Sequence, residues 1–232
     1  MKDLKNLSVV KVIEGSSRPG LARGNLGVVM AKAGVGKTAC LIHIAMHKLL
    51  KNEKLVHVSL DTPPDKVTSY YSVIFCELVK ALDIRNEQDV KASVEKNRMI
   101  LSYLNQSFQI QRLKEYLKNL GEKVGHFPDT LIVDGLDFAK AERDVFEGLK
   151  EIAETSKVEI WLSALADKDA LLNVNERGIP YPCSRFDDLL SIILLLQPSQ
   201  SEILVKLLKH PDESTAKDLQ LKLNSNTFLA VN

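Results

Sequence analysis

The chain has 232 residues, of which 45% are hydrophobic and 26% are charged, and its formal net charge is +1. This is the composition of an ordinary soluble protein with one sizeable core, and the near-neutral charge provides no global attraction to nucleic acid or acidic membranes. Nothing in the sequence approaches the roughly 18 apolar residues of a membrane span, so we expect a cytoplasmic protein with no membrane partner. The three scattered cysteines, Cys40, Cys76 and Cys183, favour reduced thiols over a disulfide framework or a zinc site.

The predicted elements alternate between strands and helices over most of the chain. A short apolar run at 26–31 predicts a buried strand, and the apolar positions of 37–50 recur at helical spacing. The elements expected next are a strand at 54–60, a helix at 67–82, a strand at 98–104, a helix at 110–123, a strand within 129–138, a helix at 146–157 and a strand at 158–164. This alternation predicts an α/β fold with a mostly parallel sheet flanked by helices.

The C-terminal part has a different pattern. The segments 189–196, 202–208 and 217–231 are predicted to be consecutive strands joined by short polar turns, and the alternation in the last of them is typical of half-buried antiparallel strands. We therefore expect one domain over 1–232, with its core at about 20–196 and C-terminal antiparallel strands at about 189–232.

The stretch "VMAKAGVGKTACLI", residues 28–41, is a near match to the phosphate-loop pattern G-x-x-x-x-G-K-[ST]. Ala31 replaces the first glycine, whereas Gly36, Lys37 and Thr38 stand at the expected spacing. In such a loop, backbone N–H groups and a helix N-terminus surround phosphate oxygens, the lysine reaches the β- and γ-phosphates, and the threonine hydroxyl binds Mg²⁺. The predicted nucleotide-binding residues are Lys32, Ala33, Gly34, Val35, Gly36, Lys37, Thr38 and Ala39.

Two carboxylates complete the predicted site. Asp134 ends the apolar run "LIVD", where it is expected to hold Mg²⁺. The nearby Asp137 is the alternative for this role, and it is interpreted first as a capping or turn residue. Asp61 ends the strand after the phosphate-loop helix, where strand ends meet a ligand crevice, so it is a candidate for orienting and deprotonating the attacking water. The alternative role for Asp61 is as an N-cap of the next helix.

Four stretches in this order, "GLARGNLGVVMAKAGVGKTACLIHIA", "VHVSLD", "LIVDGLDF" and "VEIWLSALA", resemble the RecA-like P-loop ATPases, especially the KaiC-like and DnaB-type replicative-helicase branch. The resemblance covers about residues 14–232. It implies an ATPase core that forms rings or filaments with nucleotide between subunits. It also implies phosphate and Mg²⁺ roles for Lys37 and Thr38, a metal role for Asp134, and the place of the family's catalytic glutamate for Asp61.

The sequence departs from this family at three places. An aspartate at position 61 shortens the carboxylate arm by one methylene, and a displacement of about 1 Å can cost ~100-fold in rate, so slow turnover is expected. Ala164 stands where the helicase branch has glutamine, while Ser163 remains a candidate polar sensor. Near the C-terminus Lys209 is followed by His210 instead of an arginine, which leaves Lys209 as the candidate trans-acting residue and disfavours a vigorous ring motor.

A second family also resembles this loop. "KAGVGKT" is similar to the "KGGVGKT" loop of the MinD and ParA ATPases, in which the first lysine, Lys32 here, crosses a dimer interface. The segment "GLARGNL" before the loop and the antiparallel C-terminus favour the RecA-like interpretation. The scarcity of arginine argues against a small-molecule kinase, which needs a basic lid.

Two further features receive structural interpretations. His43 and His47 lie four residues apart on the predicted helix, and we expect a solvated pair, because the glutamate of the zinc-protease pattern is missing. The polar segment 173–188 carries Arg177, Tyr181 and Arg185, which suit contact with nucleic acid. Two arginines make a poor patch, so a connecting or partner-binding loop is the stronger expectation.

These observations predict a protein that binds Mg-ATP, hydrolyses it slowly, and uses its nucleotide state to control self-association or a protein partner. The alternatives are a nucleotide-binding scaffold without hydrolysis and a MinD-like dimeric switch.

Overall fold

The computed structural model describes residues 7–14, 20–103, 108–166, 173–212 and 220–231. Within them an eight-stranded sheet has the order β3-β2-β4-β5-β1-β6-β7-β8. The first six strands run parallel to one another, and β7 and β8 extend the sheet in antiparallel fashion. The strands are β1 (Leu26–Ala31), β2 (Leu55–Ser59), β3 (Arg98–Ser102), β4 (Thr130–Asp134), β5 (Glu159–Leu165), β6 (Leu190–Ser199), β7 (Glu202–Lys209) and β8 (Gln220–Asn224).

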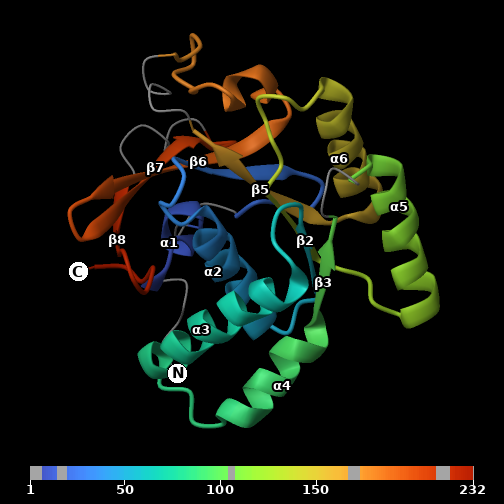
Figure 1. The fold of residues 1–232 in the computed structure, drawn as a ribbon, viewed down its shortest axis with the longest axis vertical. Helices are drawn as coiled ribbons and strands as arrows, with labels where there is room; N and C mark the ends of the chain where they lie inside the picture. Colours follow the sequence, from blue (N-terminus) through green and yellow to red (C-terminus); the bar gives the residue numbers. More distant parts are fainter. Residues whose placement is uncertain (1–6, 15–19, 104–107, 167–172, 213–219, 232) are drawn as a thin grey trace.

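Helices cover both faces of this sheet (Figure 1). The helices are α1 (Val10–Ile13), α2 (Lys37–Leu50), α3 (Pro64–Leu82), α4 (Glu87–Asn97), α5 (Ile110–Asn119), which continues as a π-helical turn at Leu120–Val124, and α6 (Arg143–Ser156); a 3₁₀ turn spans Cys183–Phe186. One buried cluster joins the sheet to α1, α2, α3 and α4, and a second joins its other face to α5 and α6. The result is a three-layered α/β architecture.

The sequence-based elements of the parallel core are confirmed, with end points that shift by a few residues. The strand at 26–31 and the helix at 37–50 have the predicted bounds. Helix α4 was not predicted, because its sequence "EQDVKASVEKN" is strongly polar. It is held to the fold by the buried side chain of Val94 and by Asn97, whose amide donates to the side-chain oxygen of Asn52 at 2.7 Å.

Strand β6 lies where the parallel core and the C-terminal antiparallel strands meet. Strand β6 is antiparallel to β7, as expected, but it also pairs in parallel with β1, so it belongs to the parallel core. The reason lies in its nearly continuous apolar run, of which Leu190 and Ile192 to Leu196 are buried. Such a run is typical of a strand covered on both faces, whereas alternation is typical of one covered on a single face. Strand β8 does alternate, with Leu221 and Leu223 buried; the preceding residues 217–219 lie outside the described residues.

Polar residues gather where the parallel strands end. Ser59, the last residue of β2, is in register with Ser102 of β3 and with Asp134 of β4. Strand β4 also pairs with β5, where Val133 is in register with Leu162. The next residues on these two strands, Asp134 and Ser163, therefore lie side by side. In parallel α/β sheets this carboxyl-end edge is where ligands bind. None of the described helices combines the length and apolar character needed to cross a bilayer.

Candidate functional site

The phosphate-loop motif forms the connection between β1 and α2 at this edge of the sheet. Gly34 and Gly36 have φ values of +76° and +104°, backbone conformations that favour glycine. Lys37 begins α2, and its ammonium lies within the curve of the loop, 3.3 Å from the carbonyl oxygen of Ala31 and 3.4 Å from that of Lys32. The predicted order of strand, curled loop and helix N-terminus is therefore present.

Thr38 and Asp134, the two predicted metal-binding residues, are in direct contact. The Thr38 hydroxyl donates a hydrogen bond of 2.6 Å to Oδ2 of Asp134. Burial lowers the pKa of Lys37, and the negative charges of Asp134 and Asp61 oppose that effect. A hydroxyl and a carboxylate are oxygen donors of the kind that Mg²⁺ prefers, so the residues present fit this ion.

Asp61 lies on the same edge of the sheet, two residues after β2 ends. Its Oδ1 accepts a hydrogen bond of 2.8 Å from the Thr62 hydroxyl. Its carboxylate packs on Gly135, where an added Cβ would lie 2.9 Å from the Asp61 Cγ. The N-cap of α3 is Pro63, so Asp61 does not cap that helix.

The other two polar candidates, Ser163 on β5 and Asp137 after the end of β4, have structural partners. Ser163 is buried, and its hydroxyl accepts a hydrogen bond of 2.9 Å from the Gly135 N–H. It lies beside the metal-binding candidates, as expected of a sensor, but it contacts the backbone next to Asp134. Asp137 accepts from the N–H groups of Ala139 and Lys140, which is the turn role that the sequence predicted.

These residues line one cleft of about 840 Å³. Its walls also include residues that the sequence did not reveal. Thr227 and Phe228, in the segment after β8, border the phosphate loop. Tyr70 and Val73 of α3 form an exposed apolar rim of the cleft. The Phe228 ring lies so close to Gly36 that an added Cβ there would be 2.0 Å from its Cζ. Because Phe228 is nearly 200 residues away along the chain, only the pairing of the terminal strands brings it to the loop.

The structure does not bring the remaining candidates into this cleft. The Lys209 ammonium donates to the backbone carbonyl of Asp187, which precedes β6, and Lys209 does not line the cleft. Arg185 donates to the carbonyls of Phe138 and Ala139 at 2.9 and 2.8 Å and so fastens its own segment to the β4–α6 connection. Arg177 lies 4.0 Å from the Asp187 carboxylate. These contacts fit the expectation of a connecting segment for 173–188.

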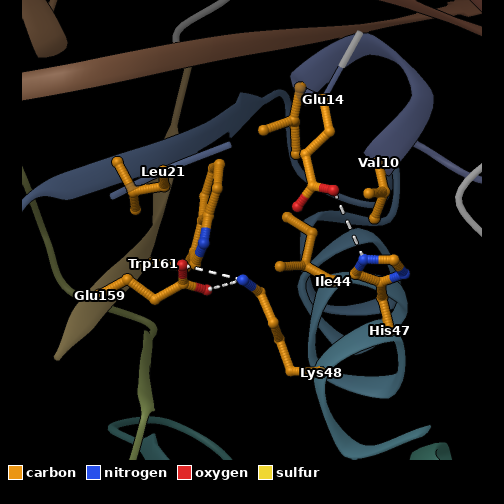
Figure 2. A pocket seen from close by; sticks show the side chains of 9 residues that line it. Val10, Glu14, Leu21, Ile44, His47, Lys48, Glu159 and Trp161 are labelled. Atoms are coloured by element: carbon orange, nitrogen blue, oxygen red, sulfur yellow. Dashed lines mark hydrogen bonds and ion pairs between the residues drawn. The ribbon is translucent and has the colours of Figure 1, made fainter. Parts of the chain in front are cut away.

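The prediction of a solvated histidine pair on α2 is wrong, because His43 and His47 are 1% and 3% exposed. They are buried because α1 and the C-terminal segment cover this part of α2. The His43 ring stacks on Phe228, with centroids 6.2 Å apart. Figure 2 shows His47 facing Glu14, with the nitrogen 3.7 Å from the carboxylate, beside the ion pair of Lys48 and Glu159. The neighbouring His47 ring lowers the Glu14 pKa to about 2, although partial burial acts in the opposite direction. The cavity between these groups, about 10 Å³, has room for about one water molecule, so it is not a ligand site.

Burial of histidines makes the fold sensitive to acid. Burial lowers the pKa of His43 to about 4, and the backbone of Thr227 only partly opposes this. The unfolded chain therefore binds a proton near pH 6.5 that the folded chain does not accept until about pH 4. We expect the free energy of unfolding to fall as the pH drops through this window, by about 3 kcal/mol for this residue. Urea unfolding of wild type and His43→Leu at pH 7.5, 5.5 and 4.5 measures this. An equal dependence of the free energy of unfolding on pH in the two proteins would contradict it.

The phosphate loop, the mostly parallel sheet and its antiparallel extension form a RecA-like P-loop fold. No protein-family model matches the chain. The chain is 27% identical over 179 residues to a "Probable plasmid replicative DNA helicase" of Chlamydia psittaci. That match covers 70% of this chain but only 38% of the relative's length. Among solved structures, the ATPase domain of the protein G40p superposes with a TM-score of 0.65, at 14% identity, over 92% of this chain and 86% of that one.

Proposed function

We propose that this chain is a single RecA-like domain that binds Mg-ATP and hydrolyses it slowly, and that its nucleotide state controls self-association or a protein partner. The observation that carries the proposal is the convergence of Lys37, Asp61 and the Thr38–Asp134 pair on one cleft. These four residues come from the carboxyl ends of three strands, β1, β2 and β4, and meet there in the arrangement that phosphoryl transfer uses. The names of the similar proteins, a replicative helicase and an ATPase domain, point to the same chemistry.

Each residue has a role that follows from its position. The loop amides and Lys37 hold the β- and γ-phosphates, because the ammonium already lies within the loop and loses little freedom on binding. Thr38 and Asp134 would hold Mg²⁺, which, when bound, neutralises charge on the phosphate oxygens. Asp61 then accepts a proton from the attacking water and orients it toward the γ-phosphate.

Turnover is proposed to be slow for two reasons. The aspartate arm is one methylene shorter than the family's glutamate, so Asp61 reaches less far into the cleft. The candidate trans-acting residue, Lys209, already donates to Asp187 in its own chain, and a shared site would require it to exchange that contact for a neighbour's phosphate. A partner or a neighbouring copy that supplies an additional cation is therefore expected to raise the rate.

The fold does not favour the MinD-like alternative. That interpretation requires a chain without the antiparallel extension, whereas β7 and β8 continue the sheet here and the segment after β8 borders the phosphate loop. The Lys32 side chain is exposed, and its backbone carbonyl helps to close the loop.

Asp61→Asn tests the proposed hydrolysis. Replacement of a general base at this position is expected to reduce phosphate release by about 100-fold or more, because the amide cannot accept the proton of the attacking water. The affinity for Mg-ATP is expected to stay within about threefold of wild type, since the side chain keeps its volume and does not contact the loop lysine. Phosphate release and fluorescent-nucleotide binding, both with purified protein, measure the two quantities.

Asp65→Asn provides the matched control, because Asp65 is an exposed aspartate in the first turn of α3. It is expected to leave both quantities unchanged. Equal turnover in wild type and Asp61→Asn would rule out Asp61 as the base. Tight nucleotide binding without any turnover in wild type would identify the scaffold alternative.

A further inference from the structure

Thr62, the residue after Asp61, lies in the connection between β2 and α3, yet both polar groups of its backbone are hydrogen-bonded to side chains. The N–H of Thr62 donates a hydrogen bond of 3.1 Å to the hydroxyl of Ser59, at the end of β2. On the other side, the hydroxyl of Ser102, at the end of β3, donates a bond of 3.1 Å to the Thr62 carbonyl. Both polar groups of this residue's backbone are therefore fixed by side chains that the sheet itself positions.

The two serines are well suited to this task because they end neighbouring strands in register. Ser59 is fully buried and is paired with Ser102 on one side and with Asp134 on the other. The strand pairing continues one residue past these strand ends. The Tyr103 N–H donates to the Ser59 carbonyl, and the Leu60 N–H donates to the Asp134 carbonyl, each at 2.9 Å. Groups on strand ends are held more precisely than groups on connections.

Thr62, whose backbone is fixed in this way, contacts the carboxylate of Asp61 through its side chain. Its hydroxyl donates a bond of 2.8 Å to Oδ1 of Asp61. The carboxylate also packs on Gly135, whose N–H donates a hydrogen bond to the Ser163 hydroxyl. The carboxylate therefore has two contacts with ordered groups, the Thr62 hydroxyl and the Gly135 backbone.

We propose that Thr62 is the positioning residue of Asp61, and that Ser59 and Ser102 act behind it by fixing the Thr62 backbone. This inference rests on the proposed function, in which Asp61 orients the attacking water. A short carboxylate arm has less reach, so a small rotation moves its oxygens away from the line of attack, and a displacement of about 1 Å can cost ~100-fold in rate. The hydroxyl of Thr62 offsets this by selecting one rotamer of Asp61.

The test compares Thr62→Val, which removes the hydroxyl but keeps the shape, with Thr62→Ser, which keeps it. The first readout is the χ1 distribution of Asp61 from NMR scalar couplings in isotopically labelled protein, and it does not depend on turnover. We expect a single rotamer in wild type and Thr62→Ser, and averaged couplings in Thr62→Val. The second readout is the kinetics of Mg-ATP hydrolysis, where kcat is expected to fall on the order of 10-fold in Thr62→Val with KM unchanged, and to recover in Thr62→Ser.

Two further variants make the result decisive. Ser102→Ala removes the hold on the Thr62 carbonyl from a different strand and is expected to broaden the χ1 distribution of Asp61 in the same direction. Thr155→Val is the control, because it also removes a threonine hydroxyl bond, that to the Glu151 carbonyl, from the surface of α6. Unchanged couplings of Asp61 in both Thr62→Val and Ser102→Ala would overturn the proposal. If the couplings change but Asp61→Asn keeps full turnover, the positioning stands and the catalytic role of Asp61 fails.

Discussion

Lys37→Ala is expected to lower kcat/KM for Mg-ATP by more than ~10³-fold. A hydrogen bond to a charged group contributes about 1.5–3 kcal/mol, and the lysine is proposed to make such bonds to the bound phosphates and to the charge that develops in the transition state. In the folded protein its ammonium is half-buried within the loop and held by the carbonyls of Ala31 and Lys32. Nucleotide binding and phosphate release with wild type and variant prepared identically measure the loss.

Lys32→Ala is the matched control, because it removes another lysine side chain from the same loop. Lys32 is exposed and contributes to the loop through its carbonyl, which alanine retains. We expect the Lys32→Ala protein to bind and hydrolyse ATP as wild type does. If Lys32→Ala instead abolishes ATP-dependent dimerisation, the MinD-like alternative is correct and the RecA-like assignment of the interface is wrong.

The sequence predicted the parts of the site that depend on local pattern. The loop curls because glycines stand where φ is positive, and Asp134 meets Thr38 because buried apolar runs become parallel strands whose ends share one edge. These relations follow from spacing and burial alone. The turn role of Asp137 was likewise predictable from its position directly after a strand end.

The features that the sequence did not predict depend on contacts between distant segments. His43 and His47 look like an exposed pair on an amphipathic helix, yet α1 and Phe228 cover them, and nothing local to α2 indicates this. The Ser59–Thr62–Ser102 arrangement requires β3 to pair with β2, which a list of strands does not specify. The polar helix α4 depends on its tertiary contacts, which override weak amphipathic pattern.

Among these distant contacts, the one made by the segment after β8 bears most directly on the nucleotide site, because it places an aromatic ring on the phosphate loop. Phe228 is 7% exposed, has a φ of +56°, and packs against both Gly36 and His43. Its neighbours are tied to the rest of the protein by backbone bonds, from the Ala230 N–H to the Leu7 carbonyl and from the Asn224 N–H to the Leu229 carbonyl. The shape of the loop is therefore coupled to the C-terminal strands.

A comparison of Gly36→Ala with Gly34→Ala measures this coupling. Both glycines have positive φ, so each alanine carries a backbone cost of about 1–2 kcal/mol. At Gly34 an added Cβ has no described atom within 4 Å, whereas at Gly36 it would overlap the Phe228 ring. Overpacking of this kind adds about 1–3 kcal/mol, so Gly36→Ala is expected to destabilise the protein by about 3 kcal/mol or more and to abolish nucleotide binding.

The double variant Gly36→Ala/Phe228→Leu separates the two causes of this loss. Leucine removes the ring atoms that the new methyl group would strike, and it leaves the backbone cost in place. Urea unfolding of the wild type, both single variants and the double variant gives an interaction free energy, which we expect to be favourable by about 1–2 kcal/mol. An additive cycle would show that the loop tolerates the methyl group by moving away from Phe228, and that the C-terminal segment does not constrain the nucleotide site.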